Sequence, residues 1–165
     1  MNRIVVTAAV AATQLLLVGV AVAPQLSARV SGDTYLMRVA PLDPIDPFRG
    51  AYVSLDYPDL RHDSSRSPGE PGLGSLDDGE EGDLYITLVE RDGVWAADAW
   101  TRERPSKGPY LACDDRSWQI RCGIESWFLP QDEAAATEDL LRDGAVAEVK
   151  VDGRGNAAVV GVRAP

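Results

Sequence analysis

No charged residue occurs within residues 4–28, and residues 4–23 consist almost entirely of Val, Ala, Leu and Ile. At about 1.5 Å of rise per helical residue, a stretch of this length spans the ~30 Å hydrocarbon core of a bilayer. A buried helix of a soluble domain would normally carry a polar stripe, and this stretch has none. The sequence therefore predicts a single transmembrane helix that contacts the bilayer through residues 4–23.

This segment has two interpretations, a cleaved signal peptide and a retained anchor. Ala21, Val22 and Ala23 are the small residues that signal peptidase requires. However, Pro24 would follow the cleaved bond, and the apolar run exceeds the usual ~7–15 residues of a signal peptide, so we favour the anchor. Because Arg3 precedes the segment, the positive-inside rule predicts a cytoplasmic N-terminus and an extracytoplasmic C-terminal part.

The remainder of the 165-residue chain is long enough for one domain, which we place at residues 33–165, behind an anchor at residues 1–32. This domain carries 26 acidic and 14 basic residues. Nucleic acid and anionic lipid headgroups both attract basic side chains, so an acidic domain is a poor partner for either. We expect no nucleic acid as a partner.

The only two cysteines, Cys113 and Cys122, are nine residues apart. Their spacing suits a structural disulfide across a short loop, as expected of an exported domain in an oxidising compartment. Free thiols are the alternative. A metal site would need further ligands nearby, and the single histidine, His62, lies far along the chain, so we expect no metal and no cofactor.

Short stretches with a period of two residues dominate the domain, which is typical of strands. Asp92-Gly93 between two apolar runs indicates a tight hairpin. A short helix is predicted at 132–142, and a mobile acidic loop rich in Pro and Gly at 58–82. The fold class is mainly β, an antiparallel barrel or sandwich with one short helix. The strand candidates are 35–40, 51–57, 84–90, 94–100, 110–113, 118–122, 125–129, 145–151 and 157–162.

One block of sequence resembles a known family. Gly50, Tyr52, Leu55 and Tyr57 match the defining segment of the GDYXXLXY proteins, a bacterial family named for Gly-Asp-Tyr-x-x-Leu-x-Tyr, while Ala51 stands in place of the Asp. The segment 123–130, which begins Gly-Ile-Glu, is similar to a later part of the family's pattern. The resemblance implies a membrane-anchored, extracytoplasmic, mostly β domain, in some members beside or fused to a multi-pass membrane protein. It implies no established reaction.

The same block has a physical interpretation of its own. In a strand starting at Gly50, side chains alternate, so Val53, Leu55 and Tyr57 would share a core face. Asp-Pro turns and an ion pair just before this strand would latch its start in place. The alternative is a polar surface for a ligand or a partner's loop. The candidate surface residues are Asp43, Asp46, Arg49, Tyr52 and Tyr57.

Catalytic patterns are weak, and we assign no catalytic residue. No paired carboxylates stand out, and the acidic run at 77–83 lacks the alternating spacing of a calcium loop. Three hypotheses follow. The first, which we favour, is a non-enzymatic accessory module for a membrane protein; the second is a carboxylate-dependent envelope hydrolase with a concave acidic site near Arg49 or Arg121. The third is a glycan-binding module that exposes its tryptophans in a row on one face.

Overall fold

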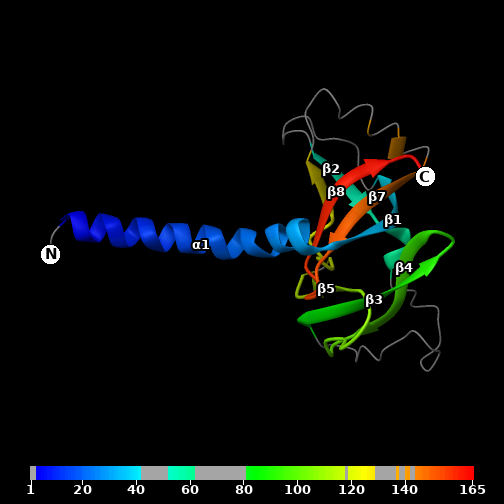
Figure 1. Cartoon of the computed structure of the whole chain (residues 1–165), viewed down its shortest axis with the longest axis horizontal. Coiled ribbons are helices and arrows are strands. Elements are labelled where there is room, and N and C mark those ends of the chain that lie inside the picture. The colour runs from blue at the N-terminus through cyan, green and yellow to red at the C-terminus, as the bar shows by residue number, and fades with distance from the viewer. Residues whose placement is uncertain are drawn as a thin grey trace.

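The computed structural model describes residues 3–41, 52–61, 81–117, 119–128, 137, 140–141 and 144–165. One long apolar helix, α1 (Arg3–Ser31), projects from a domain of eight antiparallel strands in two sheets (Figure 1). The sheets stack in a sandwich-like arrangement, and within the described ranges they do not close into a barrel. The prediction of a mainly β domain behind an apolar helix is confirmed.

The larger sheet has five strands in the order β6-β2-β1-β7-β8. Its central strand, β1, pairs with β7 from Asp33↔Val151 to Val39↔Ala145, but with β2 only at its far end. The chain therefore holds β2 and β6 as a short two-stranded extension of the sheet. The strands are β1 (Asp33–Pro41), β2 (Tyr52–Asp56), β6 (Ser126–Phe128), β7 (Ala145–Val151) and β8 (Ala157–Arg163).

The smaller sheet has three strands in the order β4-β3-β5: β3 (Asp83–Arg91), β4 (Val94–Thr101) and β5 (Tyr110–Asp114). Asp92 and Gly93 join β3 to β4 with φ values of 53° and 80°. Two positive φ values in a two-residue loop match the twist that a tight hairpin requires. The predicted hairpin is confirmed.

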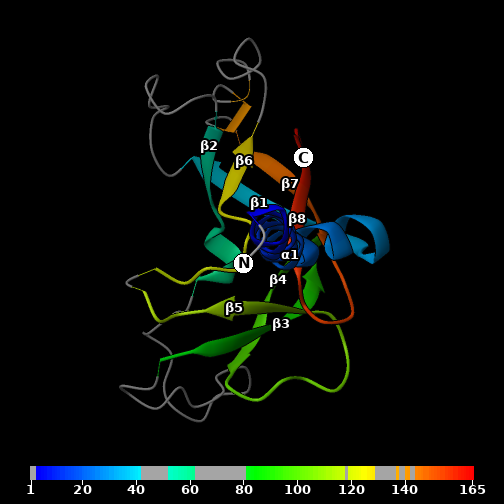
Figure 2. The same ribbon diagram turned by 90° about the vertical axis from the view of Figure 1, so that its left-hand side faces the viewer.

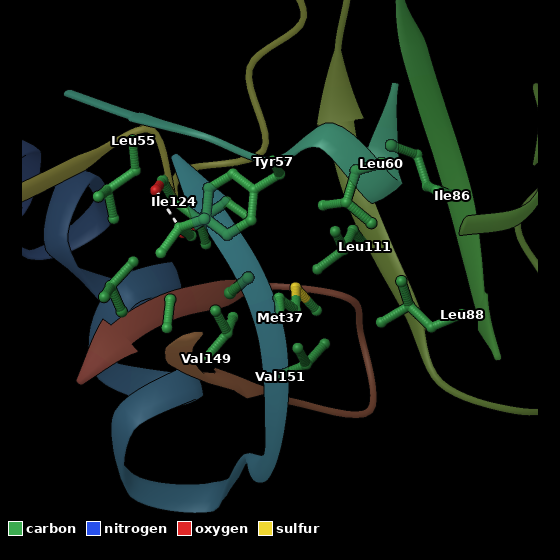
Figure 3. Packing of buried hydrophobic residues seen from close by; sticks show 14 of the residues in the cluster. Met37, Leu55, Tyr57, Leu60, Ile86, Leu88, Leu111, Ile124, Val149 and Val151 are labelled. Atoms are coloured by element: carbon green, nitrogen blue, oxygen red, sulfur yellow. Dashed lines mark hydrogen bonds between the residues drawn. The ribbon is translucent and has the colours of Figure 1, made fainter. Parts of the chain in front are cut away.

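The core lies between the two sheets, and alternate residues of β3 are buried in it, whereas β7 and β8 each begin with three consecutive buried residues. On β2, Val53 and Leu55 are buried and Ser54 is only half-buried, as the predicted alternation requires. A short 3₁₀ helix, η1 (Pro58–Leu60), follows β2 and adds Leu60 to the core. Figure 3 shows Leu60 beside Ile86 and Leu111 of the smaller sheet, and Leu55 and Met37 of the larger sheet belong to the same cluster.

Three predicted elements differ from the structure or fall mostly outside its described residues. The predicted strand 118–122 is wrong for its described residues: only Arg121 forms a bridge, to Asp114, while Trp118 lies outside the described residues. The Cys122 N–H donates to the Glu125 carboxylate instead of to a neighbouring strand, which ends strand pairing there. Of the predicted helix 132–142, the described residues Thr137, Leu140 and Leu141 are helical. In the predicted loop 58–82, η1 occupies the start and residues 62–80 lie outside the described part.

The last turns of α1 are joined to the β domain. Ala28 is fully buried, and the Ser27 hydroxyl donates to the Asp152 carboxylate in the turn between β7 and β8. That carboxylate also accepts the backbone N–H groups of Arg154 and Asn156 and the Asn156 side-chain amide. Burial by itself raises the pKa of Asp152, but these hydrogen bonds outweigh burial and hold the pKa below its usual value.

The same turn contacts the smaller sheet. Gly155 has a φ of +84°, and its carbonyl accepts the N–H of Ala112 in β5 at 2.9 Å. A Cβ at this position would lie 2.6 Å from the Tyr110 ring and 2.8 Å from the Ala112 nitrogen. Only glycine fits both the backbone conformation and this close approach.

We expect Gly155→Ala to lower the free energy of unfolding by at least about 2 kcal/mol, because the new methyl group has a strained φ and collides with β5. Urea unfolding of the full-length protein in detergent, followed by tryptophan fluorescence, measures the change. Gly153→Ala in the same turn is the control, because nothing lies within 4 Å of its Cβ. Equal stability of the two variants would contradict the close approach.

The depressed pKa of Asp152 predicts a stability that depends on pH. Because the folded protein binds this proton less readily than the unfolded chain, the stabilisation is present above the ordinary carboxyl pKa of about 4 and is lost as the pH falls through the lower folded value. Unfolding curves between pH 3 and pH 7 should show this loss, and Asp152→Asn should reduce its slope. Asp98→Asn, at an exposed position of β4, should leave the slope unchanged. A slope that is identical in all three proteins would refute the assignment.

Candidate functional site

A solvent-open cleft of about 810 Å³ lies where the β2–β6 extension faces the smaller sheet. One wall comes from β2, η1 and the segment before β6, and the other from β3, β4 and residues 119–122. Its lining mixes apolar side chains with both signs of charge. The lining residues are Ser54, Leu55, Asp56, Tyr57, Leu60, Arg61, Ile86, Trp100, Gln119, Ile120, Arg121, Cys122, Ile124, Glu125 and Ser126.

Tyr57 connects two parts of the first wall, the end of β2 and the segment before β6. Its ring is buried beside Leu60 and Ile124 (Figure 3), and its hydroxyl donates a 2.9 Å hydrogen bond to the Ile124 carbonyl. Burial, followed by the nearby charge of Glu125, raises the pKa of this phenol far above its usual value. Tyr57 is therefore a neutral hydrogen-bond donor at any physiological pH.

Glu125 holds the segment before β6, which belongs to the same wall, in its conformation. Its carboxylate accepts the backbone N–H groups of Cys122 and Gly123, and its own carbonyl accepts the N–H of Leu55 at 2.9 Å. Gly123 has a φ of +83°, which glycine adopts without strain. The Gly-Ile-Glu sequence thus forms a turn whose glutamate side chain accepts hydrogen bonds from the turn's backbone. The glutamate carbonyl joins this turn to β2 through a backbone hydrogen bond.

The predicted disulfide between Cys113 and Cys122 is present. It links β5 of the smaller sheet to Cys122, which lines the cleft directly before the Gly-Ile-Glu turn. A disulfide in a short loop is typical of an oxidising compartment.

Two charged groups lie at the open side of the cleft. Asp56 accepts hydrogen bonds from both Arg61 Nε and Arg61 Nη2, at 3.2 and 2.6 Å. Arg121 is exposed, and its backbone pairs with Asp114 through two 2.8 Å hydrogen bonds. The cleft lining therefore includes an exposed arginine and a carboxylate that is already paired.

The cleft also lies next to the exit of α1. The Gln25 side-chain amide donates to the Gly123 carbonyl at 2.9 Å, so the turn that forms one cleft wall touches the helix just beyond its apolar stretch. Figure 2, viewed from the N-terminal end of α1, looks along the helix toward the domain, which it contacts through β7 and β8. The cleft therefore lies close to the point where α1 joins the domain.

The structure describes two of the five predicted surface residues, Tyr52 and Tyr57. Asp43, Asp46 and Arg49 lie outside the described residues, so both the latch and the pocket stay predictions. Tyr52 belongs to β2 and pairs with Phe128 of β6. Tyr57 lines the cleft, but its ring is buried in the core. Its hydroxyl holds the Ile124 carbonyl of the cleft wall in place.

The tryptophans form no exposed row among the three that the structure describes. Trp100 is buried, while Trp95 and Trp127 pack against the core, Trp95 edge-on to the Tyr35 ring at 4.8 Å. The described part of the chain therefore lacks the stacking platform that a glycan-binding module was expected to show. Trp118 lies outside it.

The hydrolase hypothesis required a concave site that gathers acids near Arg49 or Arg121. The cleft does bring Asp56 and Glu125 to the same hollow as Arg121. Both carboxylates, however, accept hydrogen bonds that build the fold, Asp56 from Arg61 and Glu125 from two backbone N–H groups. Both side chains therefore already serve to hold the backbone and a neighbouring arginine in place.

The role of Asp152 was not recognised in the sequence. The Gly-rich turn 152–156 was visible, but its link to Ser27 crosses 125 residues and carries no local pattern. The side of the cleft formed by residues 119–122 was equally hidden, because it was predicted to be a strand.

Comparison with known proteins agrees with the geometry. The family described as "GDYXXLXY protein" matches residues 14–162, from within α1 to the end of β8. The match includes both the β2 segment and the Gly-Ile-Glu turn that together form one cleft wall. A search of curated proteins and a search of solved structures each find no match.

We expect Tyr57→Phe to lower the free energy of unfolding by about 1–1.5 kcal/mol, because the Ile124 carbonyl loses its partner in a buried site. Urea unfolding by tryptophan fluorescence measures the effect. The control is Tyr85→Phe, at a half-buried ring that packs on Tyr110 and whose hydroxyl makes no hydrogen bond among the described residues. If the two variants lose the same stability, the hydrogen bond does not hold the wall.

Proposed function

The chain belongs to the GDYXXLXY protein family, and from this membership and the geometry of the cleft we propose that it is a membrane-tethered, extracytoplasmic interaction module without catalytic activity. Its partner is a membrane protein, and the cleft between the β2–β6 extension and the smaller sheet receives an extracytoplasmic segment of that partner. Residues 1–32 anchor the domain, and residues 33–165 form it.

The observation that carries the proposal is the position of the cleft beside the helix exit. α1 is apolar enough to cross a membrane, and Gln25 touches the Gly123 carbonyl in the cleft wall. An extracytoplasmic loop of a neighbouring membrane protein emerges at the same height, so it reaches the cleft without extra length. The disulfide supports an oxidising compartment for the domain, and Arg3 before the span supports a cytoplasmic N-terminus.

The lining supports a peptide segment as the occupant. Leu60, Ile86 and Trp100 provide an apolar floor, while Arg121 and the Asp56–Arg61 pair provide charges at the rim. Mixed apolar and charged contacts suit an extended polypeptide, whose side chains alternate in direction. Asp43, Asp46, Arg49 and Tyr52 belong to the proposed contact surface as its continuation along the chain.

Site-specific photocrosslinking in native membranes tests this proposal. A photoreactive residue at Gln119, exposed at the cleft, should capture an integral membrane protein, whereas one at Glu90, exposed near the β3–β4 turn, should not. The cleft variant Arg121→Glu should abolish capture, because it reverses the charge at the rim. Arg91→Glu, an exposed arginine at the end of β3, is the matched control and should leave capture intact.

Two results would contradict the proposal. Equal capture from Gln119 and Glu90 would mean that the cleft is not the contact surface. Persistent capture in a folded Arg121→Glu variant, verified by its urea midpoint, would mean the same. A soluble glycan or a processed substrate found at the cleft in place of a membrane protein would favour the hydrolase or glycan hypotheses.

A further inference from the structure

The helix α1 continues beyond the predicted span. It runs for eight residues past Ala23, through Pro24 to Ser31. Proline has no N–H to donate to the preceding turn and commonly bends a helix at its position. Figure 2 looks down the first part of α1 and shows its last turns leaving that axis and running sideways across the domain.

These last turns have two different faces. One faces the domain through buried Ala28 and through the hydrogen bonds of Gln25 and Ser27. The other carries Leu26 and Val30, four residues apart and therefore on the same side, which are 56% and 76% exposed. Because the opposite face of these turns packs on the domain, the domain itself does not cover Leu26 and Val30.

Three cations gather around the same turns. Arg29 is exposed on the helix, Lys150 Nζ lies 3.0 Å from the Arg29 carbonyl, and Arg154 Nη2 lies 3.1 Å from the Ser27 hydroxyl. Asp152, 3.9 Å from the Arg154 guanidinium, is buried and accepts other hydrogen bonds. A domain that is acidic as a whole therefore presents positive charge where its helix leaves it.

We propose that the last turns of α1 lie in the bilayer interface, with Leu26 and Val30 at the boundary of the acyl chains and with Arg29, Lys150 and Arg154 at the level of the lipid phosphates. Only Pro24 and Gln25 separate the stripe from the predicted span, residues 4–23 of the same helix. A short apolar face flanked by Lys and Arg is typical of helices in the interface, where long basic side chains reach the phosphates.

This placement fixes the domain on the membrane surface. The span, the interfacial turns and the β7–β8 turn are joined by Ala28 and the Ser27–Asp152 hydrogen bond, without a linker. Gly32, directly after α1, has no room for a side chain, because a Cβ would lie 2.9 Å from the Val151 backbone and closer still to the Ala28 carbonyl. The inference rests on α1 as a membrane anchor and is independent of any protein partner.

Spin labels at single cysteines test the depth of these turns in the full-length protein in phospholipid nanodiscs. The two native cysteines form a disulfide, so Leu26→Cys, Val30→Cys and the control Asp98→Cys can each be labelled alone. Oxygen concentrates in the bilayer and a nickel chelate in water. We expect the ratio of oxygen to nickel collision rates to be several-fold higher at positions 26 and 30 than at 98.

Ratios at positions 26 and 30 that equal the ratio at 98 would overturn the proposal, since the domain would then stand clear of the lipid. Labels that are accessible to water in nanodiscs but shielded from both reagents in native membranes would also overturn it, and would assign the stripe to a partner helix. Using two label positions keeps the test decisive if one variant does not fold.

The cations are tested by lipid charge. We expect the ratio at position 30 to be higher in phosphatidylglycerol than in phosphatidylcholine nanodiscs, and Arg29→Gln to reduce this difference, whereas Arg91→Gln in the smaller sheet should not. Equal ratios in the two lipids would contradict the proposed contact between these cations and the lipid phosphates. Neither result depends on photocrosslinking at the cleft, so failure of one proposal leaves the other standing.

Discussion

The Asp152 carboxylate accepts hydrogen bonds from two parts of the chain that are far apart in the sequence: the end of α1, through Ser27, and its own turn, through Arg154 and Asn156. Because that turn also presents Gly155 to β5, one buried acid connects the helix, the larger sheet and the smaller sheet. A buried carboxylate is costly to desolvate unless it is well hydrogen-bonded, and here each contact contributes to the same geometry.

The residues by which the family is recognised serve this architecture. Tyr57 and Glu125 each use a side-chain polar group to hold a backbone in place, Tyr57 at Ile124 and Glu125 at its own turn. Their bonds hold β2 against the segment before β6, a pairing too short to persist alone. The motif thus describes a wall of the cleft, and the cleft's contact chemistry comes from other side chains, such as Arg121 and Trp100.

Local features of the fold were readable from the sequence because their signals are local. Asp92-Gly93 marks a turn, alternate burial of Val53 and Leu55 marks a strand, and two cysteines nine residues apart suit a disulfide. The predicted strand at 118–122 was wrong for its described residues because the N–H of Cys122 is taken by a side chain, which alternation does not reveal.

Features that depend on distant contacts were not predictable in this way. The cleft exists only because β2 and β6 meet the smaller sheet, and the contact of Gln25 with Gly123 spans 98 residues. Of the predicted surface residues, only Tyr57 can be placed at the cleft by its side chain. The apolar span was obvious, whereas the bend after Pro24 and the division of the last turns into a domain face and an apolar face required the structure.

The direct connection between α1 and the β domain affects the entropy that the domain would lose on binding a partner. A domain on a flexible tether searches a large volume and loses orientational entropy on binding, whereas a domain joined to its span through Ala28 and Ser27 has lost that freedom already. In the proposed membrane-anchored arrangement, the contact of Gln25 with the Gly123 carbonyl holds the cleft at one height above the bilayer. The search for the proposed membrane partner is then reduced to two dimensions and a rotation.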